Sequence, residues 1–432
     1  MATTSTMERV SHVLRRLSMG VQPETLATVR DVDGARAAAL DLAGAPPTPL
    51  DVPAPASFRD AKDVTAIAEP IAWWVRQMAS GHRMIEERLV WFWHDHFATS
   101  VAKVKVPFLM YRQHLTIRQH ATGSFRELLH AMAKDPAMLV YLDGITNTAA
   151  QRNENFGREC MELFTLGRDG GYTQDDVVAA SRSFSGWVVN APGRRFSRSD
   201  VPAWSSYVAG ARHDDRMKTL LGVTGTHDLD GALEILLDHP ATARHVAGKL
   251  YRELVGLDPD DATTTRLADS FRRDYAILPL VESVVADPAF VSDAAVRAKV
   301  RTPVEKLVGL LQAVPGASLE LGRVNPRARG GRANATGAGP ALRALSYIPF
   351  VPPNVGGFPK GPRLLGPHQL VHSFDLLSAV GGPPPGGSDP GAAFTALGLF
   401  DVNERSRKVV ASESDPARRF ALVVGSPEYA LT

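Results

Sequence analysis

Apolar residues recur at helical spacing along most of the chain. Between residues 8 and 19, Val10, Val13, Leu14 and Leu17 are three or four residues apart, which places them on one face of a helix. The same periodicity, interrupted by proline and glycine, predicts further helices over residues 22–42, 60–78, 84–99, 107–121, 124–135, 153–166, 173–184, 229–238, 240–255, 260–273, 276–286 and 294–313. We therefore expect a mainly α protein, built as a large multi-helix orthogonal bundle.

Three local signals refine these helices. Ser124 with Glu127, and Thr173 with Asp176, have the spacing of a capping box, in which the two side chains satisfy the free N–H groups at a helix start. Pro70 lies inside the helix predicted for residues 60–78, so we expect a break or kink there.

Residues 187–222 have a different pattern, with short extended pieces between turn residues. They predict a small hairpin or extended insertion, and this is the only β element that we expect. The glycine-rich segments 314–340 and 381–391 have few apolar residues, so we expect them to be mobile loops. No repeat of fixed period occurs, and a single helical domain over residues 6–430 is predicted.

The composition is that of a globular protein and narrows the possible partners. The chain has 432 residues, of which 44% are hydrophobic and 22% are charged. Its 48 Lys and Arg residues nearly balance its 46 Asp and Glu residues, which argues against a nucleic-acid partner. Cys160 is the only cysteine, so an internal disulfide and a multi-cysteine metal site are excluded. Any metal ligands must come from His, Asp and Glu.

The distribution of apolar residues also bears on location. No apolar stretch approaches the roughly 20 residues that a membrane-spanning helix needs, so no membrane span is expected. Arg15-Arg16 is not followed by the hydrophobic region of an export signal. A cytoplasmic location is therefore the default expectation.

The aromatic segment 86–97 contains two candidate metal ligands, His94 and His96. Residues two apart on a helix point to different faces, so both can ligate one ion only where the helix unwinds near Asp95. A histidine between tryptophans is also typical of a core residue that is hydrogen-bonded to a neighbour. Both interpretations remain open from the sequence.

Segment 153–167 contains two candidate ligands of another kind. Asn155, Glu159 and Glu162 fall at positions i, i+4 and i+7, which form a polar stripe on an α-helix. Two ionised carboxylates on one face repel each other, so a cation, an arginine or a retained proton must compensate them. The stripe therefore indicates either a metal site or a buried Arg–Glu network.

His213 and Asp214 lie where the chain leaves the extended region, shortly before a turn at Leu221-Gly222. A His–Asp pair in a loop suits acid–base catalysis, although it also suits a turn. These two residues are the candidate catalytic groups.

Several segments, taken in this order, resemble the bacterial domain-of-unknown-function 1800 family over roughly residues 8–380. They are residues 12–20, 92–97, 153–167, 172–177, 186–187, 213–218, 239–243, 299–303 and 352–357. The resemblance implies a large, mainly helical domain and no particular reaction. Relatives often have His where this chain has Phe164, so one potential ligand is missing.

The resemblance also implies a partner. Members of this family are usually encoded beside a protein of the domain-of-unknown-function 1501 family, which looks like the alkaline-phosphatase and sulfatase superfamily and often carries a twin-arginine export signal. Export together with such a signal-bearing partner is therefore an alternative to the cytoplasmic location.

Two functional hypotheses follow. In the first, the protein is a metal-dependent enzyme, hydrolytic or oxidative, in which Glu159 and Glu162 with His94 or His96 hold iron, manganese or zinc between helices and act on a small molecule. In the alternative, it is a non-catalytic binding or chaperone-like subunit of the phosphatase-fold or sulfatase-fold partner. The same polar groups would then form a buried network that fixes the helices.

Overall fold

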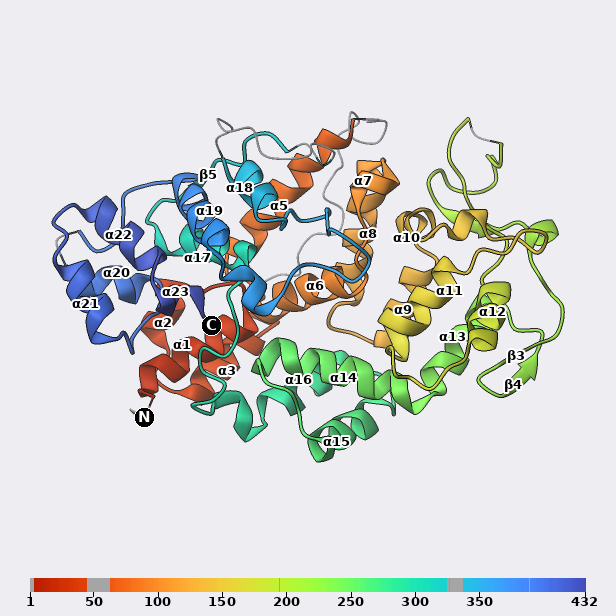
Figure 1. The fold of residues 1–432 in the computed structure, drawn as a ribbon, viewed down its shortest axis with the longest axis horizontal. Coiled ribbons are helices and arrows are strands. Elements are labelled where there is room, and N and C mark those ends of the chain that lie inside the picture. The colour runs from red at the N-terminus through yellow and green to blue at the C-terminus, as the bar shows by residue number, and fades with distance from the viewer. Residues whose placement is uncertain (1–3, 45–62, 194, 325, 327–336, 388) are drawn as a thin grey trace.

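The computed structural model describes residues 4–44, 63–193, 195–324, 326, 337–387 and 389–432. Helices dominate and follow one another along an elongated molecule (Figure 1). Up to residue 183 they are α1 (Thr6–Leu17), α2 (Pro23–Thr28), α3 (Val32–Leu40), η1 (Val64–Ile67), α5 (Ala68–Ala79), α6 (Met84–His96), α7 (Val101–Val104), α8 (Pro107–His120), α9 (Phe125–Ala133), α10 (Pro136–Tyr141), η2 (Gly144–Thr146), α11 (Asn155–Glu159), η3 (Cys160–Thr165) and α12 (Gln174–Ser183).

Helices also dominate the rest of the chain. They are η4 (Gly210–Arg212), α13 (Leu229–Asp238), α14 (Pro240–Val255), α15 (Asp261–Phe271), α16 (Ile277–Val285), η5 (Pro288–Val291), α17 (Pro303–Ala313), α18 (Ala338–Ala344), η6 (Gly361–Leu364), α19 (Pro367–Ser378), α20 (Pro390–Ala396), α21 (Glu404–Ala411), α22 (Pro416–Val424) and α23 (Pro427–Ala430). The mainly α fold predicted from periodicity is therefore confirmed.

The first helix shows how the sequence pattern produces the packing. Val10, Val13, Leu14 and Leu17 are fully buried, as their spacing predicts. Ser5 caps the helix by accepting a hydrogen bond from the Glu8 N–H group at 3.3 Å. α1 packs against α3, α6 and α14.

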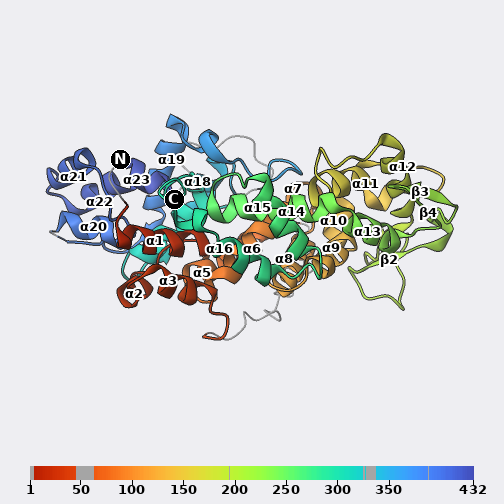
Figure 2. The same cartoon turned by 90° about the horizontal axis from the view of Figure 1, so that it is seen from below.

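Helix α6 lies in the middle of the molecule, and every residue from Ile85 to His96 is buried. A helix that is covered on all sides cannot have a purely polar face, which explains its aromatic composition. α20 to α23 lie at one end of the molecule near α1 (Figures 1 and 2). α12 lies at the other end with the strands β3 (Lys218–Leu220) and β4 (Val223–Gly225).

Two predicted helices differ from expectation near a proline. Of residues 294–313, only 303–313 are helical, because Pro303 at the first position keeps Thr302 extended. There Thr302 and Glu305 form a capping box that periodicity alone did not reveal. Pro70 lies in the first turn of α5, where it is tolerated, so it neither breaks nor kinks the helix. Residues 60–62 lie outside the described part of the chain.

The two predicted capping boxes have different outcomes. Thr173 and Asp176 form theirs at α12, as predicted. At α9 the prediction is wrong, because the Ser124 side chain makes no capping bond. Instead, the neighbouring backbone pairs with a distant segment, since the Phe125 N–H group donates to the Tyr275 carbonyl at 2.8 Å.

The helix predicted for residues 153–166 changes type in its middle. α11 ends at Glu159, and η3 continues it as a π-helix from Cys160 to Thr165. The Thr165 hydroxyl donates to the Cys160 carbonyl at 2.8 Å, five residues back, and thus fits the wider turn. The regular α spacing assumed for Glu159 and Glu162 therefore does not hold.

Three short antiparallel pairs make up the β structure of the described residues. The first two confirm the hairpin prediction for residues 187–222, although the second reaches residue 225. The third lies inside the predicted loops, which was not expected. The strands are β1 (Trp187–Val189) with β2 (Ser206–Val208), β3 (Lys218–Leu220) with β4 (Val223–Gly225), and β5 (Ser318–Leu319) with β6 (Val380–Gly381).

The two segments predicted as mobile loops therefore hold some regular structure. Besides β5 and β6, the first residues of α18 and α20 lie within them. Residues 325, 327–336 and 388, on which the rest of that prediction falls, are outside the described residues. Among the helices that the structure describes, none is both long and apolar enough to cross a membrane.

Candidate functional site

A cavity of about 270 Å³ lies between α6, α14, the segment before α17 and the segment around η6. It is lined by Trp91, Phe92, Asp95, Lys249, Arg252, Glu253, Gly256, Ala298, Lys299, Val300, Thr302, Tyr347, Lys360, Gly361 and Leu364. Three of the segments that resemble the family, residues 92–97, 299–303 and 352–357, lie at this cavity or directly beside it in the chain.

Asp95, at the end of α6, fixes one wall of the cavity. Its Oδ1 accepts a hydrogen bond from the Phe358 N–H group at 2.7 Å, and its Oδ2 pairs with Lys360 Nζ at 2.6 Å. Gly357 has a φ of +92°, and a Cβ there would collide with the Asp95 carboxylate. The glycine thus allows the loop to approach α6 closely enough to bring Lys360 to the cavity.

The Lys360 ammonium group stays charged. Burial lowers the pKa of Lys360, but the carboxylates of Asp95 and Glu253 outweigh this effect and raise the pKa above its usual value. Lys360 remains half-exposed at 55% of its side chain, whereas Asp95 is only 9% exposed. The ammonium group is therefore positioned by a buried anion while still reaching solvent.

Lys249, on α14, is held by His96. The two nitrogens, Lys249 Nζ and His96 Nδ1, are 2.8 Å apart, and His96 Nε2 is 3.1 Å from the Phe164 carbonyl oxygen. A carbonyl only accepts, so Nε2 must carry the imidazole proton, and Nδ1 then accepts from Lys249. Burial lowers the pKa of His96 well below its usual value, and the Lys249 charge adds to this effect. The imidazole is therefore neutral.

Lys249 itself has an unusual acidity. Burial and the positive charges of Lys360 and Arg252 lower its pKa to about 8, although the Asp95 carboxylate acts in the opposite direction. The side chain consequently carries an appreciable fraction of free amine at mildly alkaline pH.

Behind the cavity lies a buried ionic cluster. Lys299 forms an ion pair with Glu253, and Arg88 contacts Glu253 at 3.2 Å and Glu305 at 2.6 Å. Although burial raises the pKa of Glu253, the charges of Lys299 and Arg88 outweigh it and lower the pKa. Both carboxylates thus remain ionised and hold the cations in place.

The opposite wall is aromatic. The Tyr347 ring stacks on Phe358 at 4.8 Å and on Trp91 at 6.1 Å. Its hydroxyl has no hydrogen-bond partner among the described residues, and Tyr347 lines the cavity. Burial and the nearby carboxylates, Asp95 first, raise the pKa of Tyr347 well above its usual value. The phenol therefore stays protonated and can donate a hydrogen bond.

Taken together, four cationic side chains and two carboxylates line the cavity: Lys249, Arg252, Lys299 and Lys360 against Asp95 and Glu253. Arg252 also pairs with Asp258, which lies outside the lining. In the part of the chain that the structure describes, Lys249 is the one of these cations without a carboxylate partner. The chemistry of the lining therefore favours an anion.

A larger and more open hollow of about 600 Å³ lies near α1 and α23. Its acidic groups already have partners. Glu8 pairs with Arg15 at 2.7 Å and Arg297 at 2.9 Å, and Glu428 accepts from the Asn403 N–H group at 3.0 Å. Since these contacts are internal, the smaller cavity is the better candidate.

His94 points away from His96, in agreement with their spacing. Its Nε2 accepts a hydrogen bond from the Phe350 N–H group at 3.1 Å, and its ring meets Trp74 edge-on at 5.0 Å. Burial lowers the pKa of His94 to about 4. These contacts give His94 a place in the core and anchor the segment that leads to the Gly357 loop.

Glu159 and Glu162 are half-buried and do not line the cavity. Glu162 pairs with Arg168 at 2.8 Å. Burial and the Glu162 charge raise the pKa of Glu159, and Arg158 and Arg168 oppose this shift. Within the described residues, no group of three or more His, Cys, Asp and Glu side chains is arranged to hold a metal ion.

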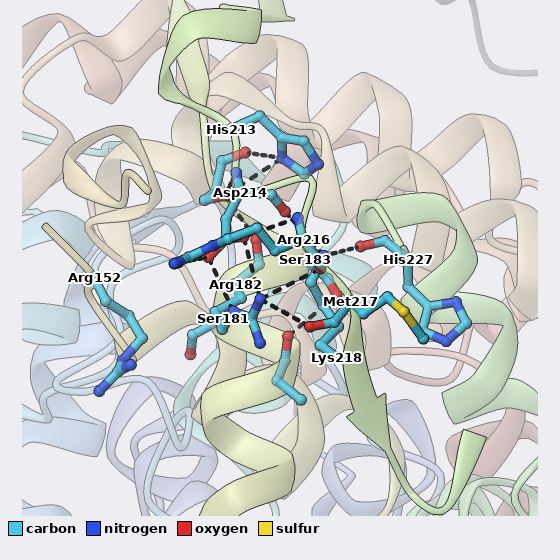
Figure 3. Close-up of polar contacts among 12 residues, drawn as sticks. Arg152, Ser181, Arg182, Ser183, His213, Asp214, Arg216, Met217, Lys218 and His227 are labelled. Carbon is cyan, nitrogen blue, oxygen red and sulfur yellow. Dashed lines mark hydrogen bonds and ion pairs between the residues drawn. The ribbon is translucent and has the colours of Figure 1, made fainter. Parts of the chain in front are cut away.

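His213 and Asp214 follow η4 and precede β3, and they lie among several arginine and serine side chains (Figure 3). The Asp214 carboxylate is gripped by Arg182, with Nε at 2.9 Å, and by Arg216, with Nη2 at 2.6 Å. Hydrogen bonds from Arg216 and Arg182 hold the pKa of Asp214 far below its usual range. His213 Nδ1 lies 3.0 Å from the Ser185 carbonyl oxygen. The Asp214 carboxylate is thus buried, whereas the guanidinium group of Arg216 is largely exposed to solvent.

The match with known protein families extends over nearly the whole chain. Residues 12–431 match the family described as "Protein of unknown function (DUF1800)". The chain belongs to the DUF1800 family. The DUF1800 match confirms the resemblance and reaches past residue 380, where the resemblance in the sequence ended. Comparison of this DUF1800 chain with curated proteins and with solved structures gave no match.

Sequence reasoning missed most of the cavity in this DUF1800 protein. It selected His96 as a candidate metal ligand, which stays a prediction, and it did not reveal that His96 accepts a hydrogen bond from Lys249. It passed over Asp95, which lies between the two selected histidines. Lys299 lies in one of the segments that resemble the family, residues 299–303, and Lys360 lies three residues after another, residues 352–357. These two segments were the available signal. Lys249 carried none, because it resembles any lysine on an amphipathic helix.

Proposed function

We propose that the protein binds a small organic anion, with a carboxylate or phosphate group, in the cavity between α6 and α14. The observation that carries this proposal is the lining itself, in which four cations from α14 and two loops face only two carboxylates. The volume of about 270 Å³ suits a molecule of a few carbon atoms.

Different walls of the cavity would contact different parts of the bound molecule. Lys249 and Lys360 supply charged donors for the anionic group, and charge-assisted hydrogen bonds are about twice as strong as neutral ones. Trp91 and Tyr347 supply apolar surface for the carbon skeleton, and the Tyr347 hydroxyl is an additional donor. Asp95 and Glu253 keep the lysines in place, so little side-chain ordering remains to be done on binding.

The proposal is tested by isothermal titration of the full chain with lactate, succinate and phosphate, with glycerol as the uncharged control. Lys360→Gln should weaken anion binding about tenfold, since one charge-assisted hydrogen bond contributes roughly 1.5 kcal/mol. Lys408→Gln removes an ammonium group that is 75% exposed on α21 and should leave binding unchanged. Equal affinity in both variants, or no anion binding at all, contradicts the proposal.

The acidity of Lys249 adds a pH test. Anion binding favours the charged form of this lysine, so affinity should be nearly constant from pH 6 to about 7 and should fall as the pH rises through about 8. Titration across this range in constant ionic strength measures it, and rising affinity at alkaline pH would be inconsistent with a cationic site.

The metal hypothesis stays a separate prediction. Glu159 and Glu162 form a close pair of carboxylates, and a cation is one of the ways to relieve the raised pKa of Glu159. Metal analysis of protein purified without a metal-binding tag, beside Glu159→Ala, tests it. Substoichiometric metal in both proteins would dispose of it.

The binding-subunit hypothesis is favoured by another observation. Asp214 and Glu162 are each neutralised by arginine, as expected for groups that stabilise a scaffold. Co-purification with the adjacent domain-of-unknown-function 1501 protein tests this alternative. A chain that stays monomeric beside that protein would exclude it.

A further inference from the structure

The cavity contains an amine that its surroundings leave available for chemistry. Lys299 and Lys360 are engaged by carboxylates, whereas the polar contact of Lys249 within the described residues is the neutral imidazole of His96. Lys249 is half-buried and lines the cavity. Lys249 can therefore contact a ligand in the cavity, and no carboxylate of the described residues pairs with its amine.

His96 also orients this amine. The Phe164 carbonyl fixes the imidazole tautomer, so that Nδ1 presents its lone pair to Lys249 at 2.8 Å. A neutral lysine amine that donates one N–H group to Nδ1 directs its own lone pair away from the ring. A protonated imidazole would repel the ammonium group and could not accept this bond, and burial keeps the ring neutral.

We infer that Lys249 forms an imine with the carbonyl group of a small anionic aldehyde or 2-oxo acid bound in this cavity. The inference rests on the proposed anion site and names the class of molecule that the site would take. Carbonyl-reactive lysines are held in desolvated pockets near other cations, and Lys249 has both surroundings.

The reaction is balanced without an oxidant or reductant. The Lys249 nitrogen forms a bond to the carbonyl carbon, the carbonyl oxygen takes up protons and leaves as water, and an imine remains. The two N–H protons of the neutral amine end on the departing oxygen, and a proton that Tyr347 gives to this oxygen is replaced from the amine nitrogen, so the phenol is restored. The protonated Tyr347 hydroxyl, in the same cavity, is a suitable donor for the departing oxygen.

The test is reductive trapping on the full chain. The protein is incubated with pyruvate or glyoxylate and sodium cyanoborohydride, and the modified residue is located by peptide mass spectrometry. We expect one saturable adduct on Lys249, formed at least tenfold faster than adducts on exposed lysines such as Lys408. Lactate, which lacks the carbonyl group, should slow labelling of Lys249 alone.

Two lysine variants and lactate competition on the natural protein test whether the adduct is specific to Lys249. Lys249→Arg should abolish the specific adduct, while Lys408→Arg should retain it, with thermal unfolding midpoints measured for both. Even where Lys249→Arg does not fold, lactate competition on the unmodified protein decides the question. Equal labelling of all lysines, with lactate still bound in titration, overturns the imine and keeps the anion site. Absence of both labelling and binding overturns the two together.

Discussion

Several buried carboxylates in this protein are compensated at short range by arginine. Arg118 Nη1 lies 2.5 Å from Glu87 Oε1, Arg88 contacts Glu305, and Asp214 sits between two guanidinium groups. Such pairs add little net stability, but removal of one partner leaves an unpaired charge, which is costly. The partners of an acidic side chain therefore indicate whether it is available for catalysis or serves to stabilise the structure.

Asp214→Asn tests this reasoning for the candidate catalytic pair. The substitution should lower the free energy of unfolding by about 2 kcal/mol at pH 7, because it removes charge-assisted hydrogen bonds to a carboxylate that is 2% exposed. Urea denaturation measures the difference. Asp215→Asn, at an exposed neighbouring position, is the matched control and should have little effect.

The same comparison has a defined pH dependence. Since the folded-state pKa of Asp214 lies below its value in the unfolded chain, the stabilisation is fully present above about pH 4 and is lost as the pH falls further. The difference in the free energy of unfolding between the natural protein and Asp214→Asn should therefore become smaller at acidic pH. A gap that stays constant down to pH 3 would show that the ion pairs are not its source.

Helix ends in this protein are fixed either by a local side chain or by a distant segment. α12 and α17 begin with capping boxes, whereas α9 begins where its backbone pairs with residues 275–277. The two kinds of start look the same in the sequence, because both place Ser or Thr three residues before an acidic residue.

This difference predicts unequal costs for matched substitutions. Thr173→Ala should destabilise the protein by about 1 kcal/mol, because the N-terminal N–H groups of α12 lose their partner. Ser124→Ala should cost less than half of that, since its side chain makes no cap. Chemical denaturation of both variants gives the comparison, and equal losses would mean that Ser124 caps α9 in solution.

The range of an interaction also explains what the sequence could predict. Helix periodicity and the cap at Thr173 depend on neighbours within four residues, so both were predicted correctly. The π-helix depends on the packing around Cys160 to Thr165. Lys249 and His96 are 153 residues apart, and no local pattern links them. The cavity could therefore be suspected only through the motifs that surround it.

At the scale of the whole molecule, one arginine connects four parts of the chain. Arg88, on α6, donates to the Arg15 carbonyl at 3.0 Å and to the Ser18 carbonyl at the end of α1. It also reaches Glu253 on α14 and Glu305 on α17. The ionic cluster behind the cavity is thus a joint between helices that are far apart in sequence.

Arg88→Met should consequently destabilise the whole protein by about 3 kcal/mol or more, because two buried carboxylates lose a partner at once. The anion-binding enthalpy should fall with it, since Glu253 also positions Lys299. Arg76→Met, at an exposed position on α5, is the control. Thermal unfolding and anion titration of both variants measure the two effects. Equal unfolding midpoints for Arg88→Met and Arg76→Met would show that the Arg88 contacts do not stabilise the protein.

The pairing of residues 299–301 with residues 430–432 has a consequence for biosynthesis. The Lys299 N–H group donates to the Thr432 carbonyl at 3.0 Å, and the Thr432 N–H group donates back at 2.7 Å. A nascent chain that has emerged from the ribosome only to residue 400 already contains every side chain that lines the cavity. The lining segment around Lys299, however, still lacks its backbone partners in residues 430–432. The proposed anion binding should therefore be weaker until residues 430–432 have also emerged and formed this pairing.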